Sequence, residues 1–261
     1  MKASLLDVLF MSEKRKGVLL LLHEEPREME FLIRSLETTR QALLPQVRIL
    51  EKNHLVSHNR DIYELTTIGK LIVGEMEPLL GTIRVLEGNL DYWGRHNLSL
   101  IPPHLMERLR ELGNCTVLVP SIQEMHEFNR EMHERSKESQ YFFQVASSFK
   151  SDFDSLFSDL VQKGTKMSFI ISGELMEYLK KEKCKEFKKY MAYERVEFYL
   201  HSGEMPFLSF VQNDFCMLFE LLTNEGAFDN TQLMYCNPGA LDWGRELFES
   251  YRENSTPITG I

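Results

Sequence analysis

The sequence predicts an α+β fold: an N-terminal winged helix-turn-helix, a long linker or dimerisation helix, and a C-terminal α/β domain with a mixed sheet. Helical periodicity fills most of residues 1–92, and one short hairpin pattern interrupts it. From residue 115 onwards, strand-like apolar runs first alternate with amphipathic helices and then follow one another, as in mixed sheets covered by helices on both faces. A polar stretch with paired prolines at 91–103 separates the two patterns, so we expect domains at 1–95 and 96–261.

The first 36 residues are expected to form three helices. Leu5 and Leu9 lie on one face of the first helix and could serve either the core or a dimer contact. Ser12 is a suitable N-cap for the second helix, because its hydroxyl can accept a bond from an unpaired amide of the first turn. Pro26 is expected to begin the third helix, at 27–36, where its missing amide costs nothing.

Residues 37–65 predict a helix that is followed at once by a small hairpin. Thr38 or Thr39 can cap this helix. The helix is expected to bury one apolar stripe, formed by Leu43, Val47 and Leu50. The following LVSHNRDIYEL gives two short apolar runs around a polar tip at 58–61. A helix followed by such a hairpin is the order of recognition helix and wing in a winged helix-turn-helix.

The other face of this helix offers side chains that reach phosphates and base edges. Pro45 removes a helical hydrogen bond and is expected to mark a bend that seats the first turn in a DNA groove. The residues expected to contact DNA are Thr38, Thr39, Arg40, Gln41, Pro45, Gln46, Arg48, Asn59 and Arg60. We therefore predict a transcription regulator that binds double-stranded DNA, with Arg60 on the backbone or in the minor groove.

The charge distribution is compatible with this prediction, although the net charge of −9 argues against a strong nucleic-acid binder. Residues 1–70 carry 11 Lys and Arg against 10 Asp and Glu, so the acidic excess lies in the rest of the chain. Between residues 38 and 60 there are four basic residues and one acidic residue. Such a modest basic surface predicts modest non-specific affinity, and a homodimer that supplies the remainder.

The longest apolar run, at 18–22, is too short to span a bilayer, and the N-terminus lacks a signal-peptide pattern. We therefore expect a soluble, cytoplasmic protein with no membrane partner. The four cysteines form no CxxC pattern, and three lie in or beside apolar runs. We expect them to be small buried hydrophobic side chains, with redox sensing or metal binding as alternatives, and we expect no disulfide framework.

Residues 68–92 predict one long apolar helix, which Pro78 should kink or divide. Its apolar face is wider than a small domain needs, so the helix suits dimerisation, although packing on its own domain remains open. A short helix is expected at 104–112. The second domain is expected to contain strands at 115–119, 141–146, 166–171, 196–200, 207–211 and 215–221, and helices at 121–136, 152–163, 173–190 and 240–251.

Three motifs give the chain a family resemblance. They are YELTTIGK after the wing, DYWGRHNLSLIP at the linker, and NPGALDWGRELFESYR near the end. With these motifs the chain resembles archaeal, chiefly methanogen, regulators that join a winged helix to a methanogenesis- or filamentation-regulator sensor domain. The resemblance covers nearly the whole length. It implies a dimeric repressor or activator whose sensor half has a phospholipase-D-like fold.

The sequence offers no pattern for catalysis or metal binding. A phospholipase-D active site needs His and Lys as HxK, and His201 is followed by Ser202 and Gly203. There is also no GxSxG, P-loop or HExxH motif. We therefore expect no enzymatic activity, no catalytic residue, no cofactor and no metal site. His126 and His133 are seven residues apart and are interpreted as solvated or core histidines.

A site for an unknown small-molecule effector is expected beyond the carboxyl ends of the strands, where open sheets bind ligands. Ser147, Ser148 and Phe149 follow one strand, and their hydroxyls and amides could hold an anion at a helix N-terminus. The family resemblance adds Asp214 and Trp243 as candidates. For each of these residues, ordinary capping or core packing is the alternative.

Three hypotheses for the function follow. The first is a homodimeric, sequence-specific DNA-binding regulator that a ligand in the second domain modulates. The second is a protein-interaction adaptor that uses the winged helix and the acidic second domain without binding DNA. The third is a degenerate or unrecognised hydrolase.

Overall fold

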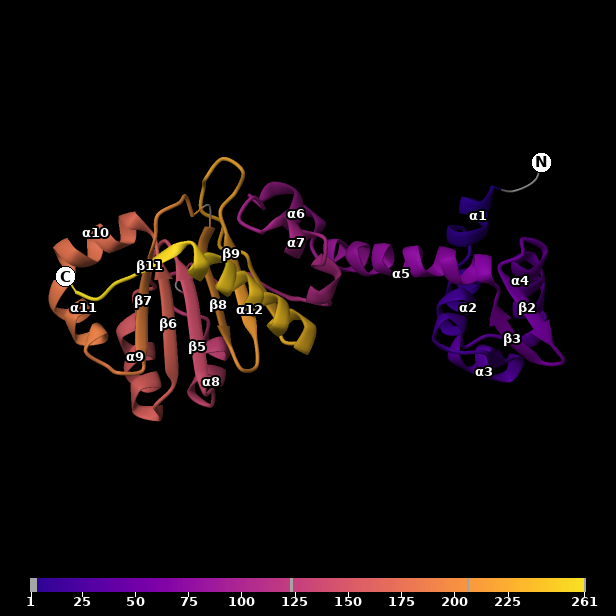
Figure 1. The fold of residues 1–261 in the computed structure, drawn as a ribbon, viewed down its shortest axis with the longest axis horizontal. Helices are drawn as coiled ribbons and strands as arrows, with labels where there is room; N and C mark the ends of the chain where they lie inside the picture. Colours follow the sequence, from indigo (N-terminus) through magenta and orange to yellow (C-terminus); the bar gives the residue numbers. More distant parts are fainter. Residues whose placement is uncertain (1–3, 123, 206, 261) are drawn as a thin grey trace. The chain divides into compact units, whose positions relative to one another are not determined.

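The computed structural model describes residues 4–122, 124–205 and 207–260 of the 261-residue chain. It divides into two compact units, Met1–Leu80 and Gly81–Ile261, and Figure 1 labels most of their elements. The boundary expected near Arg95 is therefore too late in the chain. Val85 and Trp93 explain the difference, because both side chains are buried in the hydrophobic core of the second unit.

The first unit packs several helices around one small sheet. Its helices are α1 (Leu5–Phe10), α2 (Glu13–Glu24), α3 (Met29–Ser35), α4 (Arg40–Lys52) and the first part of α5 (Thr67–Glu87). Its strands are β1 (Arg27–Glu28), β2 (Val56–Asn59) and β3 (Ile62–Leu65), in the order β1-β3-β2. One apolar core joins these elements, and it includes the predicted stripe of Leu43, Val47 and Leu50 on α4.

The helix starts of this unit follow from their capping residues. The hydroxyls of Ser12 and Thr39 accept bonds from first-turn amides of α2 and α4, which confirms both predicted caps. The third helix begins at Met29 and not directly after Pro26. The intervening residues form β1, which pairs antiparallel with β3. Because their backbone groups bond to β3, these residues are extended instead of helical.

The long helix α5 begins where Thr66 caps it by accepting a bond from the Gly69 amide at 3.0 Å. Of the two outcomes expected at Pro78, a kink or a division, the division does not occur, because the helix continues to Glu87. A separate helix, α6 (Leu90–Arg95), follows. The predicted single helix over 68–92 is therefore wrong in its last part, because the Asn89 side chain caps a new helix there.

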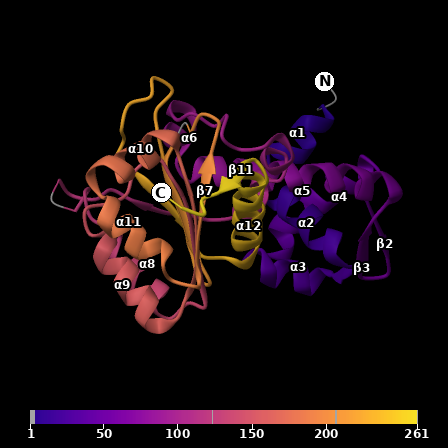
Figure 2. The ribbon, with the colours of Figure 1, turned by 60° about the vertical axis from the view of Figure 1, so that its left-hand side comes forward.

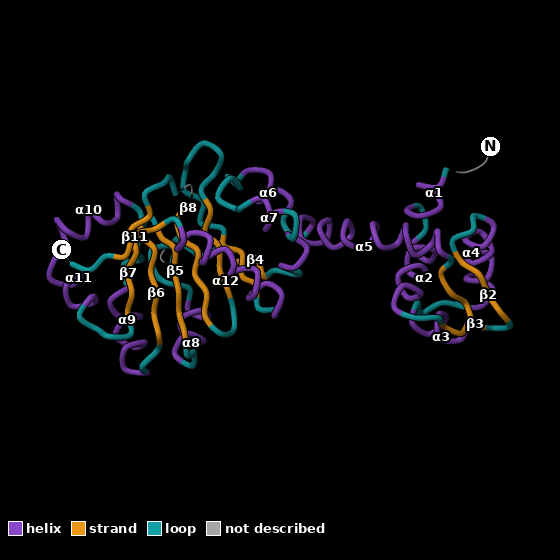
Figure 3. Tube along the Cα trace, in the orientation of Figure 1, coloured by secondary structure: helices purple, strands orange, loops and turns teal. Residues whose placement is uncertain are grey.

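In the described residues, the second unit is built on an eight-stranded mixed sheet, in the order β11-β7-β6-β5-β8-β9-β10-β4 (Figure 3). The strands are β4 (Thr116–Leu118), β5 (Tyr141–Ala146), β6 (Lys166–Ile171), β7 (Val196–His201), β8 (Phe207–Asn213), β9 (Met217–Leu221), β10 (Gln232–Tyr235) and β11 (Ser255–Pro257). β5, β6 and β7 are parallel neighbours, whereas the other pairs are antiparallel. The predicted mixed sheet is present.

Helices cover both faces of this sheet, as Figure 2 shows in a view close to edge-on. One face carries α8 (Arg130–Lys137), α9 (Phe153–Lys163), α10 (Gly173–Glu182) and α11 (Cys184–Met191). The other carries α6, α7 (Pro103–Met106), the 3-10 helix η1 (Leu109–Leu112) and α12 (Pro238–Glu253). The unit therefore has two apolar cores, one on each side of the sheet.

Several predicted helices are shorter or broken. The helix expected over 121–136 begins only at Arg130, because Asp152 accepts a bond from the Phe128 amide and Asn129 then caps α8. The helix expected over 173–190 is interrupted at Lys183, where the backbone leaves helical geometry with φ at −131°. The helix expected over 104–112 is two short pieces, α7 and η1. In the part of the chain that the structure describes, no helix combines the length and the apolar character needed to cross a membrane.

Cys216 and Cys236 form a disulfide, whereas the sequence predicted no disulfide framework and favoured buried hydrophobic side chains as the first interpretation of the cysteines. Cys216 directly precedes β9 and Cys236 directly follows β10, so the antiparallel pairing of these strands brings the two cysteines together. The strand β10 was not predicted, because TQLMYC lacks an alternating or β-branched pattern. The disulfide therefore could not be predicted either.

The two tryptophans of the chain provide a test of the core that α12 completes. The Trp243 indole donates to the Leu105 carbonyl at 2.9 Å, whereas the buried Trp93 indole nitrogen has no hydrogen-bond partner among the described residues. We expect Trp243→Phe to lower the free energy of unfolding by about 2 kcal/mol, because it removes the indole bond to the Leu105 carbonyl, which keeps only its bond from the Arg108 amide, and opens a small cavity. Urea unfolding followed by circular dichroism measures this change.

Trp93→Phe is the matched control, since it removes a similar volume and no hydrogen bond. We expect its effect to be smaller by at least about 1 kcal/mol. Equal losses in the two variants would contradict the role that we assign to the Trp243–Leu105 bond.

Candidate nucleic-acid interface and ligand cavity

The buried stripe of α4 determines which of its side chains face outward. Leu43, Val47 and Leu50 are fully buried, so positions on the opposite side of the helix are exposed. The exposed polar and basic residues of that side are Gln41, Arg48 and Lys52, with Pro45 between them. The helix continues through Pro45 to Lys52 as one element. Lys52 was missed by the sequence analysis, although it lies four residues after Arg48 and therefore on the same face.

The hairpin of β2 and β3 is tied to α4 by two contacts. Arg40 at the start of α4 lies 3.3 Å from a carboxylate oxygen of Asp61 at the hairpin tip. His58 of β2 contacts the carboxylate of Glu51 and stacks on Tyr63. These contacts make the exposed face of α4 and the hairpin tip one continuous surface. We call it the α4 surface and define it as Gln41, Arg48, Lys52, Asn59 and Arg60.

The predicted DNA-contacting residues differ in their exposure and in whether other residues of the first unit already engage them. Gln41, Pro45, Arg48, Asn59 and Arg60 are exposed, and Arg60 adopts a left-handed backbone with φ at 57° at the hairpin turn. Arg40 is also exposed, but two carboxylates engage it, because Glu30 lies 3.5 Å away in addition to Asp61. Thr38 is half-buried, and the Thr39 hydroxyl is used by the cap of α4.

Gln46 does not belong to the α4 surface. Its side-chain oxygen accepts a bond from Arg15 at 2.7 Å and lies 3.3 Å from the Ser12 hydroxyl. Both partners belong to the start of α2, so Gln46 joins α4 to α2 inside the first unit. Its position beside the buried stripe, three residues after Leu43, explains why it points away from the exposed side.

A cavity of about 520 Å³ lies beyond the carboxyl end of β5, as expected for an open sheet. Ser147, Ser148 and Phe149 line it, together with the first turns of α9 and α10 and with α11. The charged and phenolic side chains of the lining are Lys150, Asp154, Glu174, Tyr178, Lys183, Glu186 and Tyr190. Three carboxylates and several aromatic rings therefore surround this space, so it does not match the purely anion-binding site that the serines and the helix N-terminus suggested.

Lys150 lines the cavity, but a carboxylate neutralises its charge. Its ammonium group donates to Glu220 at 2.6 Å and to the Met125 carbonyl at 3.1 Å. Glu220 is 3% exposed and also accepts a bond from Gln232 at 2.6 Å. A buried carboxylate needs such partners, since its desolvation is otherwise unfavourable by several kcal/mol. The pair holds the loop after β5 against β9 and β10.

A second cavity of about 620 Å³ adjoins the first and shares Ser147 and Glu174 with it. It extends over the carboxyl ends of β6 and β7, where Ser172 and His201 line it. Partial burial lowers the pKa of His201, because desolvation disfavours the charged imidazolium. The two cavities together place hydroxyls, carboxylates and one imidazole along the end of the parallel strands.

Asp214 and Trp243 lie apart from these cavities. Asp214 accepts a bond from the Gln140 amide at 2.6 Å in the turn between β8 and β9. Trp243 is fully buried in the core below α12. Both residues are engaged in the architecture of the second unit, so we do not carry them into the ligand site. Among the described residues, no group of three or more His, Cys, Asp or Glu side chains is arranged to hold a metal ion.

Two stretches of the chain match known domain families. Residues 3–84 match "Methanogenesis regulatory protein FilR1, N-terminal domain", and residues 125–254 match "Methanogenesis regulatory protein FilR1, middle domain". A curated relative, the methanogenesis regulatory protein FilR1 of Methanothrix harundinacea (strain 6Ac), is 26% identical over 254 residues. That alignment covers 95% of this chain and 56% of the relative, so the chain spans little more than half of the relative's length.

Two solved structures show weaker likenesses. TrmBL2, described as an archaeal chromatin protein with a novel mode of DNA binding, is 15% identical, with 94% of this chain and 93% of that chain covered and a TM-score of 0.44. A phosphatidylserine synthase from Haemophilus influenzae Rd KW20 is 13% identical, with 50% and 37% covered and a TM-score of 0.38. Both TM-scores are too low to assign a fold. The family matches, in contrast, agree with the motifs of the sequence: the chain is similar, in both of its units, to the N-terminal and middle domains of the methanogenesis regulatory protein FilR1.

Proposed function

We propose that this chain is a sequence-specific DNA-binding transcription regulator whose first unit is a winged helix-turn-helix. The observation that carries the proposal is the α4 surface, in which an exposed helix face and a hairpin tip are fixed to each other. Such a pairing lets a helix enter the major groove while the hairpin follows the backbone. The similarity to a relative that is named as a regulatory protein supports the same conclusion.

The side chains of the α4 surface suit distinct roles in this proposal. Arg48 and Lys52 are exposed and basic, so they can contact phosphates or guanine edges. Gln41 lies about two turns before Arg48 on the same exposed face of α4, and its amide can bond an adenine edge. Arg60 at the hairpin tip reaches the backbone or the minor groove. Thr39 and Gln46 act through the position of α4, and Arg40 keeps the hairpin in place.

The proposed regulator works as a homodimer through α5. Ile68, Leu71 and Leu79 are large apolar side chains of α5 that remain exposed. An exposed apolar stripe on a long helix is typical of a helix that packs on a second copy. Two copies also bring two α4 surfaces to half-sites of one operator, which raises an otherwise modest affinity.

The second unit is proposed to sense a small molecule in the cavity at the end of β5. Its volume suits a small metabolite, and its aromatic rings and carboxylates favour a ligand with both apolar and hydrogen-bond-donating parts. The phospholipase-D-like character of this unit remains a prediction from the family resemblance. The same holds for the expectation that the unit has no enzymatic activity.

A protein-interaction adaptor is the second candidate, and one observation favours it. Arg40, which the sequence placed among the DNA contacts, is engaged by Glu30 and Asp61. Together with the net charge of −9, this leaves few basic groups for a duplex. A steep fall of duplex affinity with rising salt supports the regulator, whereas salt-insensitive or absent binding supports the adaptor.

The first test replaces Arg48 by Ala. We expect about tenfold weaker binding to an operator fragment, and a salt dependence that is shallower by about one unit for each lost phosphate contact. Fluorescence anisotropy at several salt concentrations measures both quantities. Lys188→Ala is the control, because it removes an exposed basic residue from α11 of the other unit. If the two variants bind alike, the role assigned to the α4 surface is wrong.

The second test concerns the dimer. Leu71 is 70% exposed, so Leu71→Glu is not expected to disturb the fold, but it places a charge in the proposed interface. We expect sedimentation to shift from dimer to monomer, with an unchanged circular dichroism spectrum. Val119→Glu, at a residue that is 68% exposed in the second unit, serves as the control. A dimer that persists in Leu71→Glu would place the interface elsewhere.

The third test concerns the ligand cavity. We expect Ser148→Trp to fill the mouth of the cavity, because Ser148 is exposed on its lining. A metabolite that changes the operator affinity of the natural protein should then have no effect, while the affinity without the metabolite stays the same. Ser158→Trp, on the exposed side of α9 and outside the lining, is the control. An effector response that survives in Ser148→Trp contradicts a site in this cavity.

A further inference from the structure

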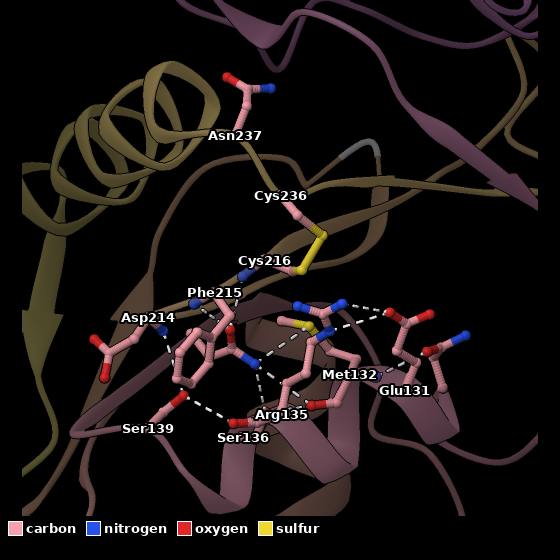
Figure 4. Close-up of a disulfide and its surroundings, with 12 residues drawn as sticks. Glu131, Met132, Arg135, Ser136, Ser139, Asp214, Phe215, Cys216, Cys236 and Asn237 are labelled. Atoms are coloured by element: carbon pink, nitrogen blue, oxygen red, sulfur yellow. Dashed lines mark hydrogen bonds and ion pairs between the residues drawn. A yellow bond between two sulfur atoms is a disulfide. The ribbon is translucent and has the colours of Figure 1, made fainter.

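The disulfide of the second unit joins the turn between β8 and β9 to the segment that precedes α12 (Figure 4). Cys216 ends the turn between β8 and β9, whereas Cys236 lies between β10 and Asn237, the N-cap of α12. The two Cα atoms are 4.2 Å apart. Reduction would therefore remove the covalent link between the β8–β9 turn and the segment that precedes α12.

The two half-cystines differ in their access to solvent. Cys216 is 0% exposed and packs in the apolar core beneath α8 to α11. Cys236 is exposed. Because thiol–disulfide exchange requires a thiolate to approach one sulfur in line with the bond, an incoming thiolate can reach only the Cys236 side in the folded protein.

We propose that this disulfide is a thiol–disulfide exchange site that an external dithiol opens at Cys236. The dithiol's thiolate attacks the Cys236 sulfur, a mixed disulfide forms there, and Cys216 leaves as a thiolate that takes up a proton. The second thiol of the dithiol then attacks its own partner sulfur and releases the Cys236 thiolate. Two electrons and two protons pass to the protein, and the dithiol becomes a cyclic disulfide.

The position of Cys236 favours the second step. Cys236 directly precedes the N-cap of α12, a helix of 16 residues. The positive end of a helix dipole stabilises a nearby thiolate, and a stabilised thiolate is a better leaving group. Cys216, in contrast, takes up a proton once it is released into its apolar environment, so it does not readily attack the mixed disulfide again. The site is therefore asymmetric, with Cys236 as the exchanging cysteine and Cys216 as the resolving one.

The β8–β9 turn remains anchored when the disulfide opens. The buried Asn213 accepts bonds from the amides of Phe215 and Cys216, both at 2.8 Å, and donates to the Ser136 hydroxyl of α8 at 3.0 Å. Asp214 adds a bond from the Gln140 amide. These contacts, drawn in part in Figure 4, hold Cys216 against α8 without help from the disulfide. The start of α12 has an anchor of its own, because the Asn237 side chain donates to the Leu112 carbonyl at 2.6 Å, so the disulfide can open without displacing either segment.

The experiment uses the full chain with Cys115 and Cys184 replaced by serine, since these two cysteines are free. In this background, Cys236→Ser and Cys216→Ser each leave one cysteine of the pair. Oxidised glutathione is the probe, and intact mass measures the rate of adduct formation in native buffer. We expect Cys216→Ser to form an adduct at Cys236 at least about tenfold faster than Cys236→Ser forms one at Cys216, because Cys216 is buried. Equal rates, or a faster Cys216, would overturn the proposal.

A second measurement uses the protein with both cysteines of the pair intact, so that it does not depend on how the single variants fold. Native protein is treated with dithiothreitol, quenched with acid and desalted, then alkylated with iodoacetamide in denaturant so that the buried Cys216 is also trapped, and analysed by mass. We expect two alkylations at Cys216 and Cys236, and an unfolding midpoint that falls on the order of 10 °C in the reduced protein. Reduction that occurs only in denaturant, or the absence of the disulfide from the oxidised protein, would contradict the proposal. Neither measurement depends on DNA binding.

Discussion

Both faces of the large sheet must be covered, and this constraint determines the architecture of the second unit. β5, β6 and β8 are mostly buried on both faces, which needs helices on each side of the sheet. Segments from the start and from the end of the unit share one face, where the Trp243 indole bonds the Leu105 carbonyl. The chain must therefore return across the sheet, and α12 can begin only beside the last antiparallel strands.

The buried pair of Lys150 and Glu220 has a corresponding role at the other end of the sheet. It fixes the loop after β5, which supplies the wall of the proposed ligand cavity, to strands that lie two places away. Because Glu220 is buried and Lys150 is mostly so, the loop cannot move freely without exposing or unpairing a charge. The cavity is therefore preformed. In the first unit, the contacts of Arg40 and His58 fix the hairpin to α4 in a similar way.

Much of this fold could be predicted because its elements carry strong local patterns. β5 and β6 have the predicted bounds, and α4 has the predicted cap and buried stripe. Elements that depend on distant partners could not be predicted. β1 has no strand pattern and exists through its pairing with β3, and β10 exists through its neighbours β9 and β4. The same reason separates Gln46 from the α4 surface, since its partners lie more than thirty residues earlier.

The stretch between the two family matches, residues 85–124, has a consequence for how the molecule can be dissected. It supplies Trp93, Leu105 and Leu112 to the core beneath α12, and β4 to one edge of the sheet. A fragment that starts at residue 125 would leave that apolar layer bare to water and would tend to self-associate. The stretch that matches the middle-domain family is therefore not an autonomous folding unit within its matched limits, and a fragment of the second unit has to begin near residue 81.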